Sequence, residues 1–201
     1  MTDTPDPDMP EHRRRNRGVL LLIVAIFLGS MLVAGALRFS GWRPATTKNN
    51  GELLQPPVDL RDRTLSLADG GEYAWNPGAR IWRIALLPPA DCAQACSDAA
   101  RDIDIVWQLM GRRADQVEVL WLCGQPGCSV PSPLREDRSL RVLRPDPGLR
   151  ALFPGADAPA GNAPGVPMYV IDPNGFVILR YAPGADPGGL RADLSKLLKL
   201  I

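Results

Sequence analysis

The sequence predicts a three-layer α/β sandwich that is exported behind a single N-terminal transmembrane helix. Three observations support this: one uncharged apolar run near the N-terminus, a strand–helix–strand order in the middle of the chain, and a strand–turn–strand–helix order at its end. The 201 residues suffice for one ordinary domain with appendages. The formal net charge is +1, so we expect no nucleic-acid partner.

The apolar run covers residues 18–37, GVLLLIVAIFLGSMLVAGAL, which are 20 residues without a charge. At 1.5 Å per residue such a helix is about 30 Å long, which matches the hydrocarbon core of a bilayer. A cleaved signal peptide is the alternative, since residues 33–36 (VAGA) resemble a cleavage site. The apolar core of a signal peptide is usually only about 7–15 residues long. We therefore interpret the run as a retained transmembrane helix.

Arginines on the two sides of this run predict its orientation. Four arginines precede it, in HRRRNR, and only Arg38 and Arg43 follow at similar range. The excess of positive charge favours a cytoplasmic N-terminus. We expect a single-pass protein of a bacterial inner membrane whose C-terminal domain faces the oxidising periplasm. The predicted parts are a cytoplasmic tail (1–17), a transmembrane helix (18–37), a linker (38–57) and a periplasmic domain (58–201).

The first half of the exported domain predicts a βαβ unit. Residues 58–73 contain VDL and TLSL, which are typical of a small lead-in hairpin. Residues 81–87, IWRIALL, predict a buried strand, and residues 97–111 show apolar side chains at helical spacing. Residues 117–122, VEVLWL, predict a second buried strand. Two strands joined by a helix are expected to be parallel neighbours with a right-handed crossover.

The second half predicts an antiparallel ββα unit. A short strand at residues 140–143 precedes two strands, 168–171 and 176–181, which flank the turn DPNG. A last helix is expected to begin with Asp186 as N-cap and Pro187 at its first position. A parallel βαβ half followed by an antiparallel ββα half is the thioredoxin arrangement. We therefore predict a thioredoxin-like three-layer sandwich.

Cys92 and Cys96 stand at the corner where the first buried strand meets the helix. Unpaired backbone N–H groups and the helix dipole favour a thiolate at such a corner. The i, i+4 spacing places both sulfurs on one side of a helical turn, where they can form a disulfide or bind a soft ion such as Cu(I). A purely structural disulfide is the alternative in an oxidising compartment. The position at the corner favours a functional dithiol.

Cys123 and Cys128, in CGQPGC, follow the second buried strand. Because parallel strands end at the same edge of a sheet, we expect Cys123 to emerge near Cys92. Three interpretations are open: a second redox or thiol-relay pair, a four-cysteine metal site, or a disulfide that closes a Gly-Pro loop. The three- and four-residue spacings of the two pairs are only a weak signal for a zinc site. We favour the loop disulfide.

Pro167 precedes the strand that is expected opposite the dithiol. A proline there is often cis and holds backbone beside the sulfurs, and the alternative is an ordinary trans proline at a strand start. Met168 either offers a thioether to Cu(I) or packs in the core. The candidate catalytic residues are Cys92, Cys96 and Pro167, and the candidate metal ligands are Cys92, Cys96 and Met168. The sole histidine, His12, precedes the anchor, which excludes a His-dependent hydrolase triad in the exported domain.

The N-terminal anchor, the Cys-x3-Cys corner and the hairpin sequence MYVIDPNGFVILRY together resemble the Sco/SenC proteins over residues 52–201. The resemblance implies a membrane-tethered thioredoxin-like domain that acts in cytochrome c oxidase assembly. In that family two cysteines and a distal histidine bind copper for oxidase subunit II. The cysteines correspond to Cys92 and Cys96, but residues 161–167 read GNAPGVP, without a histidine. The resemblance therefore implies a variant with thiol chemistry or an altered metal site.

Three functional hypotheses follow. The first is a thiol–disulfide oxidoreductase that reduces the cysteines of subunit II, with Cys92 attacking and Cys96 resolving, and it requires no cofactor. The second is a Cu(I) chaperone that uses Cys92, Cys96 and Met168. The third is a non-catalytic scaffold with permanent disulfides. The expected partners are the membrane and cytochrome c oxidase subunit II or another assembly factor.

Overall fold

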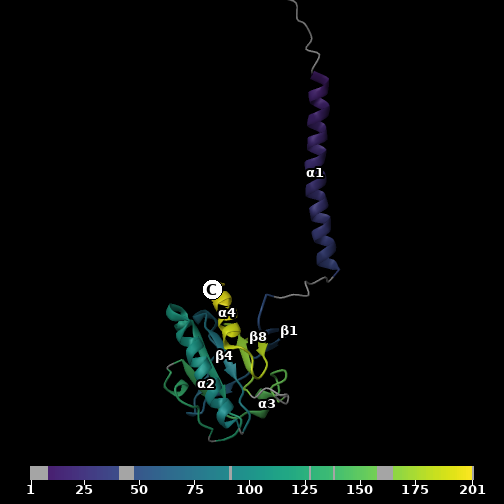
Figure 1. The fold of residues 1–201 in the computed structure, drawn as a ribbon. Coiled ribbons are helices and arrows are strands. Elements are labelled where there is room, and N and C mark those ends of the chain that lie inside the picture. The colour runs from purple at the N-terminus through teal and green to yellow at the C-terminus, as the bar shows by residue number, and fades with distance from the viewer. Residues whose placement is uncertain are drawn as a thin grey trace, which may run out of the picture. The chain divides into compact units, whose positions relative to one another are not determined.

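The computed structural model describes residues 9–40, 48–90, 92–126, 128–137, 139–157 and 165–200, with side chains from residue 16 onward. The chain divides into two units, Met1–Thr47 and Lys48–Ile201 (Figure 1). The first eight residues of the expected tail, residues 41–47 of the expected linker, and residues 161–164 of the GNAPGVP segment lie outside the described residues.

The described part of the first unit contains one helix, α1 (Met9–Phe39). Its segment Asn16–Phe39 has 24 residues and a mean hydropathy of 2.7, and is long and apolar enough to cross a membrane. The helix extends beyond the expected run 18–37 at both ends. Arginine is a strong helix former, so the end of the apolar pattern does not mark the end of the helix.

The second unit is built on a six-stranded mixed sheet in the order β1-β8-β7-β4-β5-β6. The central strand β4 pairs in parallel with β5, and β5 with β6. The pairs β4–β7, β7–β8 and β8–β1 are antiparallel. The predicted thioredoxin-like α/β class is thereby confirmed. The strands are β1 (Glu52–Asp59), β4 (Trp82–Leu86), β5 (Val117–Leu122), β6 (Leu140–Leu143), β7 (Met168–Ile171) and β8 (Phe176–Tyr181).

Strand β1 corrects the expected boundary between linker and domain. Residues 52–57, which we placed in the linker, belong to the sheet, and Leu53 pairs with Leu179 of β8. The register shifts between Leu53 and Val58. The shifted stretch contains two consecutive prolines, which cannot donate to a ladder of hydrogen bonds. They hid the strand pattern in the sequence.

Helices cover one face of the sheet and smaller elements cover the other. Helices α2 (Ala93–Gln108) and α4 (Pro187–Leu197) contact each other, and their buried residues share one core cluster with Ile84 of β4 (Figure 1). The next residue of β4, Ala85, packs into a second cluster on the opposite face. That face is covered by the hairpin of β2 (Leu65–Ser66) and β3 (Glu72–Tyr73), and by α3 (Pro147–Arg150). Three 3₁₀ turns connect elements of this unit: η1 (Pro77–Ala79), η2 (Gly111–Gln116) and η3 (Leu134–Glu136).

The helix starts explain how the cysteines are placed. Helix α4 begins as expected, with the Asp186 carboxylate accepting a hydrogen bond from Gly188 N at 2.9 Å. Helix α2 begins at Ala93, four residues before the expected start at residue 97. Cys92 is therefore its N-cap residue and Cys96 lies in its first turn. The short, small side chains of this turn masked the helical periodicity.

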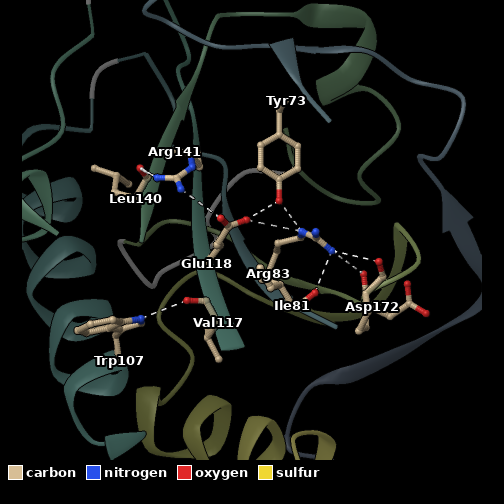
Figure 2. A network of polar contacts seen from close by, with 10 residues as sticks. Tyr73, Ile81, Arg83, Trp107, Val117, Glu118, Leu140, Arg141 and Asp172 are labelled. Atoms are coloured by element: carbon tan, nitrogen blue, oxygen red, sulfur yellow. Dashed lines mark hydrogen bonds and ion pairs between the residues drawn. The ribbon is translucent and has the colours of Figure 1, made fainter. Parts of the chain in front are cut away.

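A buried arginine organises the opposite end of β4 (Figure 2). Arg83 is 1% exposed, and its Nε donates to the Tyr73 hydroxyl at 2.5 Å. Its Nη1 donates to the carbonyls of Ile81 at 2.9 Å and Asp172 at 3.3 Å. The Tyr73 hydroxyl in turn donates to the Glu118 carboxylate at 2.5 Å. Burial and this hydrogen bond raise the pKa of Tyr73 to about 12. The network joins β3, β4 and β5 away from the cysteine corner.

Candidate functional site

Cys92 and Cys96 form a disulfide with a Cα–Cα distance of 5.3 Å. Strand β4 ends at Leu86, and the loop after it delivers Cys92 to the N-terminus of α2. The Cys92 side chain makes no capping hydrogen bond there. Cys92 is half-buried, whereas Cys96 is 8% exposed. The more exposed cysteine of the pair is therefore the one at the helix N-terminus, where a thiolate is stabilised.

Cys123 and Cys128 form a second disulfide, with a Cα–Cα distance of 5.8 Å. Cys123 directly follows β5 and its N–H donates to Leu143 O at 3.2 Å. Cys123 is 5% exposed, and Cys128 is half-buried. Of the three pairings that four cysteines allow, the structure has the one between sequence neighbours.

One open pocket of about 420 Å³ touches both disulfides. None of the lining residues that the structure describes carries a charged side chain, and the N-terminus of α2 lies at the wall of the pocket. We call it the thiol pocket. Its lining residues are Pro88, Pro89, Ala90, Cys92, Ala93, Cys96, Trp121, Gly124, Gln125, Cys128, Ser129 and Pro131.

The loop before Cys92 packs directly on the loop between Cys123 and Cys128. The Gln125 side chain donates from Nε2 to Ala90 O at 3.0 Å. A Cβ atom on Gly124 would lie 2.9 Å from Pro88 O, which is too close for any side chain to fit without movement. Glycine at 124 therefore permits the close approach of the two cysteine loops.

Arg150 of α3 holds the same loop from the other face of the sheet. Its Nη1 donates to Pro88 O at 3.0 Å, and its Nη2 donates to Leu87 O at 3.2 Å. Its Nε pairs with Asp157 at 2.6 Å. The guanidinium satisfies two carbonyls that have left the sheet, and it fixes the path of the chain towards Cys92.

Pro167 lies beside the end of β4, where its carbonyl accepts a hydrogen bond from Leu87 N at 3.2 Å. The cis peptide bonds among the described residues are Gln55–Pro56 and Ser132–Pro133, so Val166–Pro167 is trans. Pro167 therefore has the trans peptide bond of an ordinary proline at a strand start, and not the cis bond. Pro167 does not line the thiol pocket.

Met168 is 5% exposed, and it pairs with Leu86 across the sheet. It lines a different pocket of about 320 Å³, together with Gln94, Ala95 and others. The structure thus brings Cys92 and Cys96 together but does not place the Met168 thioether in the thiol pocket.

The donor set at this site does not fit standard copper chelation. In the described ranges there is no group of three or more His, Cys, Asp or Glu side chains that could hold a metal ion. Both candidate cysteine ligands are joined in a disulfide, which offers no thiolate. The arrangement fits reversible dithiol–disulfide chemistry, for which two sulfurs suffice.

Two residues of the site escaped the sequence analysis. Trp121 of β5 is 1% exposed and lines the thiol pocket. Arg150 is one of many arginines in the chain, and nothing local distinguishes it. Its role depends on the fold, which brings α3 to the end of β4.

A helix-capping disulfide that follows the central strand of such a mixed sheet defines a thioredoxin-like protein. Residues 82–201 match the family described as "Transmembrane-like, thioredoxin-like, C-terminal domain". This match covers more than half of the chain, and the chain belongs to that family. No curated protein matches the sequence.

Among solved structures, the fold is similar to that of Sco proteins, which confirms the predicted Sco/SenC-like thioredoxin fold. BsSco, described as a member of the Sco family of cytochrome c oxidase assembly proteins with a disulfide switch, is 12% identical, with 75% of this chain and 98% of that chain covered and a TM-score of 0.51. Apo Sco1 from Thermus thermophilus is 17% identical, with 77% and 99% covered and a TM-score of 0.51. Copper-bound yeast Sco1 is 15% identical, with 79% and 95% covered and a TM-score of 0.50. At these identities the likeness concerns the fold.

Proposed function

We propose that this chain is a membrane-anchored thiol–disulfide exchange protein that assists cytochrome c oxidase assembly. Its substrate is the cysteine pair of oxidase subunit II, which it reduces before copper is loaded. The observation that carries the proposal is the Cys92–Cys96 disulfide at the start of α2, with half-buried Cys92 facing an open pocket. The fold likeness to BsSco supports oxidase assembly as the process.

The exchange needs only the two sulfurs. In the reduced protein, the N-terminus of α2 stabilises the Cys92 thiolate. This thiolate attacks one sulfur of the substrate disulfide, whose other sulfur leaves as a thiolate and takes a proton. Cys96 then attacks Cys92, restores the Cys92–Cys96 disulfide and releases the second substrate thiolate. Two electrons pass to the substrate, and an external dithiol protein must supply them for the next cycle.

The N-terminal helix supports a periplasmic location for this exchange. The segment Asn16–Phe39 can span a bilayer by length and composition. Four arginines before the apolar run and two after it favour a cytoplasmic N-terminus. The second unit, which carries the thiol pocket, would then face the periplasm of a bacterial inner membrane.

The test uses the full-length protein in detergent, reduced with dithiothreitol and freed of reductant. It is mixed with an equimolar oxidised peptide that carries both subunit II cysteines, and thiols on each component are counted by alkylation and mass spectrometry. We expect the peptide to become reduced as Cys92–Cys96 becomes oxidised, and Cys92→Ser to lower the transfer rate at least 100-fold.

Two other outcomes would contradict the proposal. Failure of the peptide to become reduced, with no exchange at Cys92–Cys96, would assign the protein to the scaffold class. Stoichiometric Cu(I) binding that is lost in Cys92→Ser, together with no reduction of the peptide, would assign it to the copper chaperones. An exposed serine, Ser97→Ala, serves as a matched control on the same helix.

A further inference from the structure

We propose that Cys123–Cys128 is a second redox-active pair, which passes electrons to Cys92–Cys96 inside the thiol pocket through a Cys92–Cys128 mixed disulfide. The inference rests on the proposed function and names the internal electron donor of that site. The observation behind it is that the two disulfides, from different strands and loops, share one pocket.

The burial of the four cysteines follows a matched pattern. Each disulfide has one half-buried cysteine, Cys92 or Cys128, and both of these line the thiol pocket. Each also has one buried cysteine, Cys96 at 8% and Cys123 at 5% exposed, in the same core cluster. Each pair thus has the attacking and resolving arrangement that exchange requires. A disulfide that only closed a loop would not need a partly exposed cysteine at the wall of this pocket.

The two loops are held against each other. Gln125 donates to Ala90 O at 3.0 Å, and Gly124 lies so close to Pro88 that no Cβ would fit between them. These contacts join the segment before Cys92 to the segment before Cys128. Because the reacting groups are carried on loops that contact each other, the exchange between them is intramolecular and has a high effective concentration.

Each step of the transfer exchanges one disulfide bond for another. An external dithiol protein first reduces Cys123–Cys128. The Cys128 thiolate then attacks the Cys92 sulfur, the Cys92–Cys96 bond breaks, and Cys96 leaves as a thiolate that takes up a proton. Cys123, after losing its proton, attacks Cys128, closes the Cys123–Cys128 disulfide and releases Cys92 as a thiolate. Two electrons have moved from one pair to the other.

The helix N-terminus sets the direction of this transfer. Cys92 caps α2, so its thiolate is stabilised both as the final leaving group and in the reduced product. Cys123 and Cys128 flank a loop, and among the described residues neither stands at the start of a helix. Stabilising the reduced form of a pair makes its disulfide the stronger oxidant. Electrons therefore flow from Cys123 and Cys128 towards Cys92 and Cys96.

The test traps the mixed disulfide in the full-length protein. The variant Cys96→Ser/Cys123→Ser retains only Cys92 and Cys128, and the matched control Cys96→Ser/Cys128→Ser retains Cys92 and the buried Cys123. Both are oxidised with diamide and digested with trypsin. The native disulfides lie within single tryptic peptides, 84–101 and 114–135, so a new bond joins the two peptides. We expect at least tenfold more joined peptide from the first variant than from the control.

Single variants keep the test decisive if a double variant fails to fold. Cys123→Ser retains the native Cys92–Cys96 disulfide and has a free Cys128 thiol. We expect its yield of joined peptide to be at least tenfold higher than that of Cys128→Ser. Equal yields, or no joined peptide from either comparison, would overturn the relay. The proposed function is tested separately with Cys123→Ser/Cys128→Ser. If that protein, once reduced, still reduces the subunit II peptide while trapping fails, only the relay is wrong.

Discussion

The guanidinium of Arg150 donates a hydrogen bond to the carbonyl oxygen of Pro88 at 3.0 Å, and so links α3 to the loop that carries Cys92. The same side chain bonds Leu87 O and pairs with Asp157. It is 15% exposed, so the carbonyls it serves have little access to water as a substitute. The geometry of the thiol pocket therefore depends on a residue from the opposite face of the sheet.

We expect Arg150→Ala to lower the free energy of unfolding by about 2–3 kcal/mol, because carbonyls served by a charged donor lose their partner. Without these hydrogen bonds the loop before Cys92 is less well held, so reduction of the subunit II peptide should slow about tenfold. Urea unfolding and the transfer assay check both effects. The exposed Arg191→Ala on α4 is the matched control, and an equal effect there would contradict the assigned role.

Gly124 tests the packing of the two cysteine loops. In Gly124→Ala the new Cβ would lie 2.9 Å from Pro88 O, so the loops must separate. We expect a loss of stability of about 1–3 kcal/mol, as for other overpacked sites, and a lower yield of the Cys92–Cys128 bond. In Gly71→Ala the Cβ would meet side-chain atoms only at 3.4 Å or more. We expect Gly71→Ala to match the unmutated protein in free energy of unfolding and in the yield of the Cys92–Cys128 bond.

Asp193 ties the start of β1 to α4 and predicts a pH dependence. Its carboxylate accepts hydrogen bonds from Asn50 N at 2.6 Å, Gly51 N at 3.1 Å, the Tyr181 hydroxyl at 2.9 Å and Lys196 Nζ at 3.0 Å. Burial opposes ionisation, but these bonds outweigh it and lower the pKa of Asp193. Its stabilising contribution is therefore complete above the unfolded pKa of about 3.9 and is lost as the pH falls through the lower folded pKa.

We accordingly expect Asp193→Asn to lower the free energy of unfolding by about 2–4 kcal/mol at pH 7, because a buried acceptor is exchanged for a group that also donates. The difference from the unmutated protein should shrink as the pH falls from the unfolded pKa of about 3.9 towards the lower folded pKa, below which the carboxylate is protonated in both states. Thermal unfolding from pH 2 to pH 7 measures this. A difference that stays constant across that range would contradict the role of the charge.

The Arg83 network predicts a loss of stability without a loss of chemistry. Arg83→Met removes the buried donor of the Tyr73 hydroxyl and of the Ile81 and Asp172 carbonyls, whereas Glu118 keeps its ion pair with Arg141 at 3.3 Å. Leaving such buried acceptors unpaired costs about 1–3 kcal/mol. Strand β4 begins beside this network and ends before the cysteine loop. Folded Arg83→Met should therefore reduce the subunit II peptide at the normal rate. Exposed Arg144→Met is the control for stability. Slower reduction of the subunit II peptide by folded Arg83→Met would contradict this prediction, because it would show that the two ends of β4 are coupled.

Most of the fold was predictable because apolar runs and turn residues mark the inner strands. Strands β7 and β8 coincide with the expected segments 168–171 and 176–181, since the DPNG turn fixes both ends. Strand β1 was missed because Pro56 and Pro57 interrupt its pattern. The start of α2 was placed too late because the small residues around Cys96 show no helical periodicity.

The site was predictable only in part. A cysteine pair at a strand–helix corner is a local signal, and the parallel strands β4 and β5 bring the two cysteine loops to the same edge of the sheet, where Gln125 bonds Ala90 O. The shared pocket depends on contacts between residues far apart in the chain, such as Arg150 with Pro88 and Gln125 with Ala90. These contacts are set by the tertiary fold, so no local pattern reveals them.

The central claim is that Cys92–Cys96 is a working redox pair, and a redox titration tests it most directly. Full-length Cys123→Ser/Cys128→Ser is equilibrated with dithiothreitol buffers of graded potential, and free thiols are trapped by alkylation and counted by mass spectrometry. We expect a single two-electron transition at a potential above about −300 mV, the range of disulfides that exchange readily. A pair that stays oxidised well below about −300 mV would behave as a structural disulfide and would contradict the account.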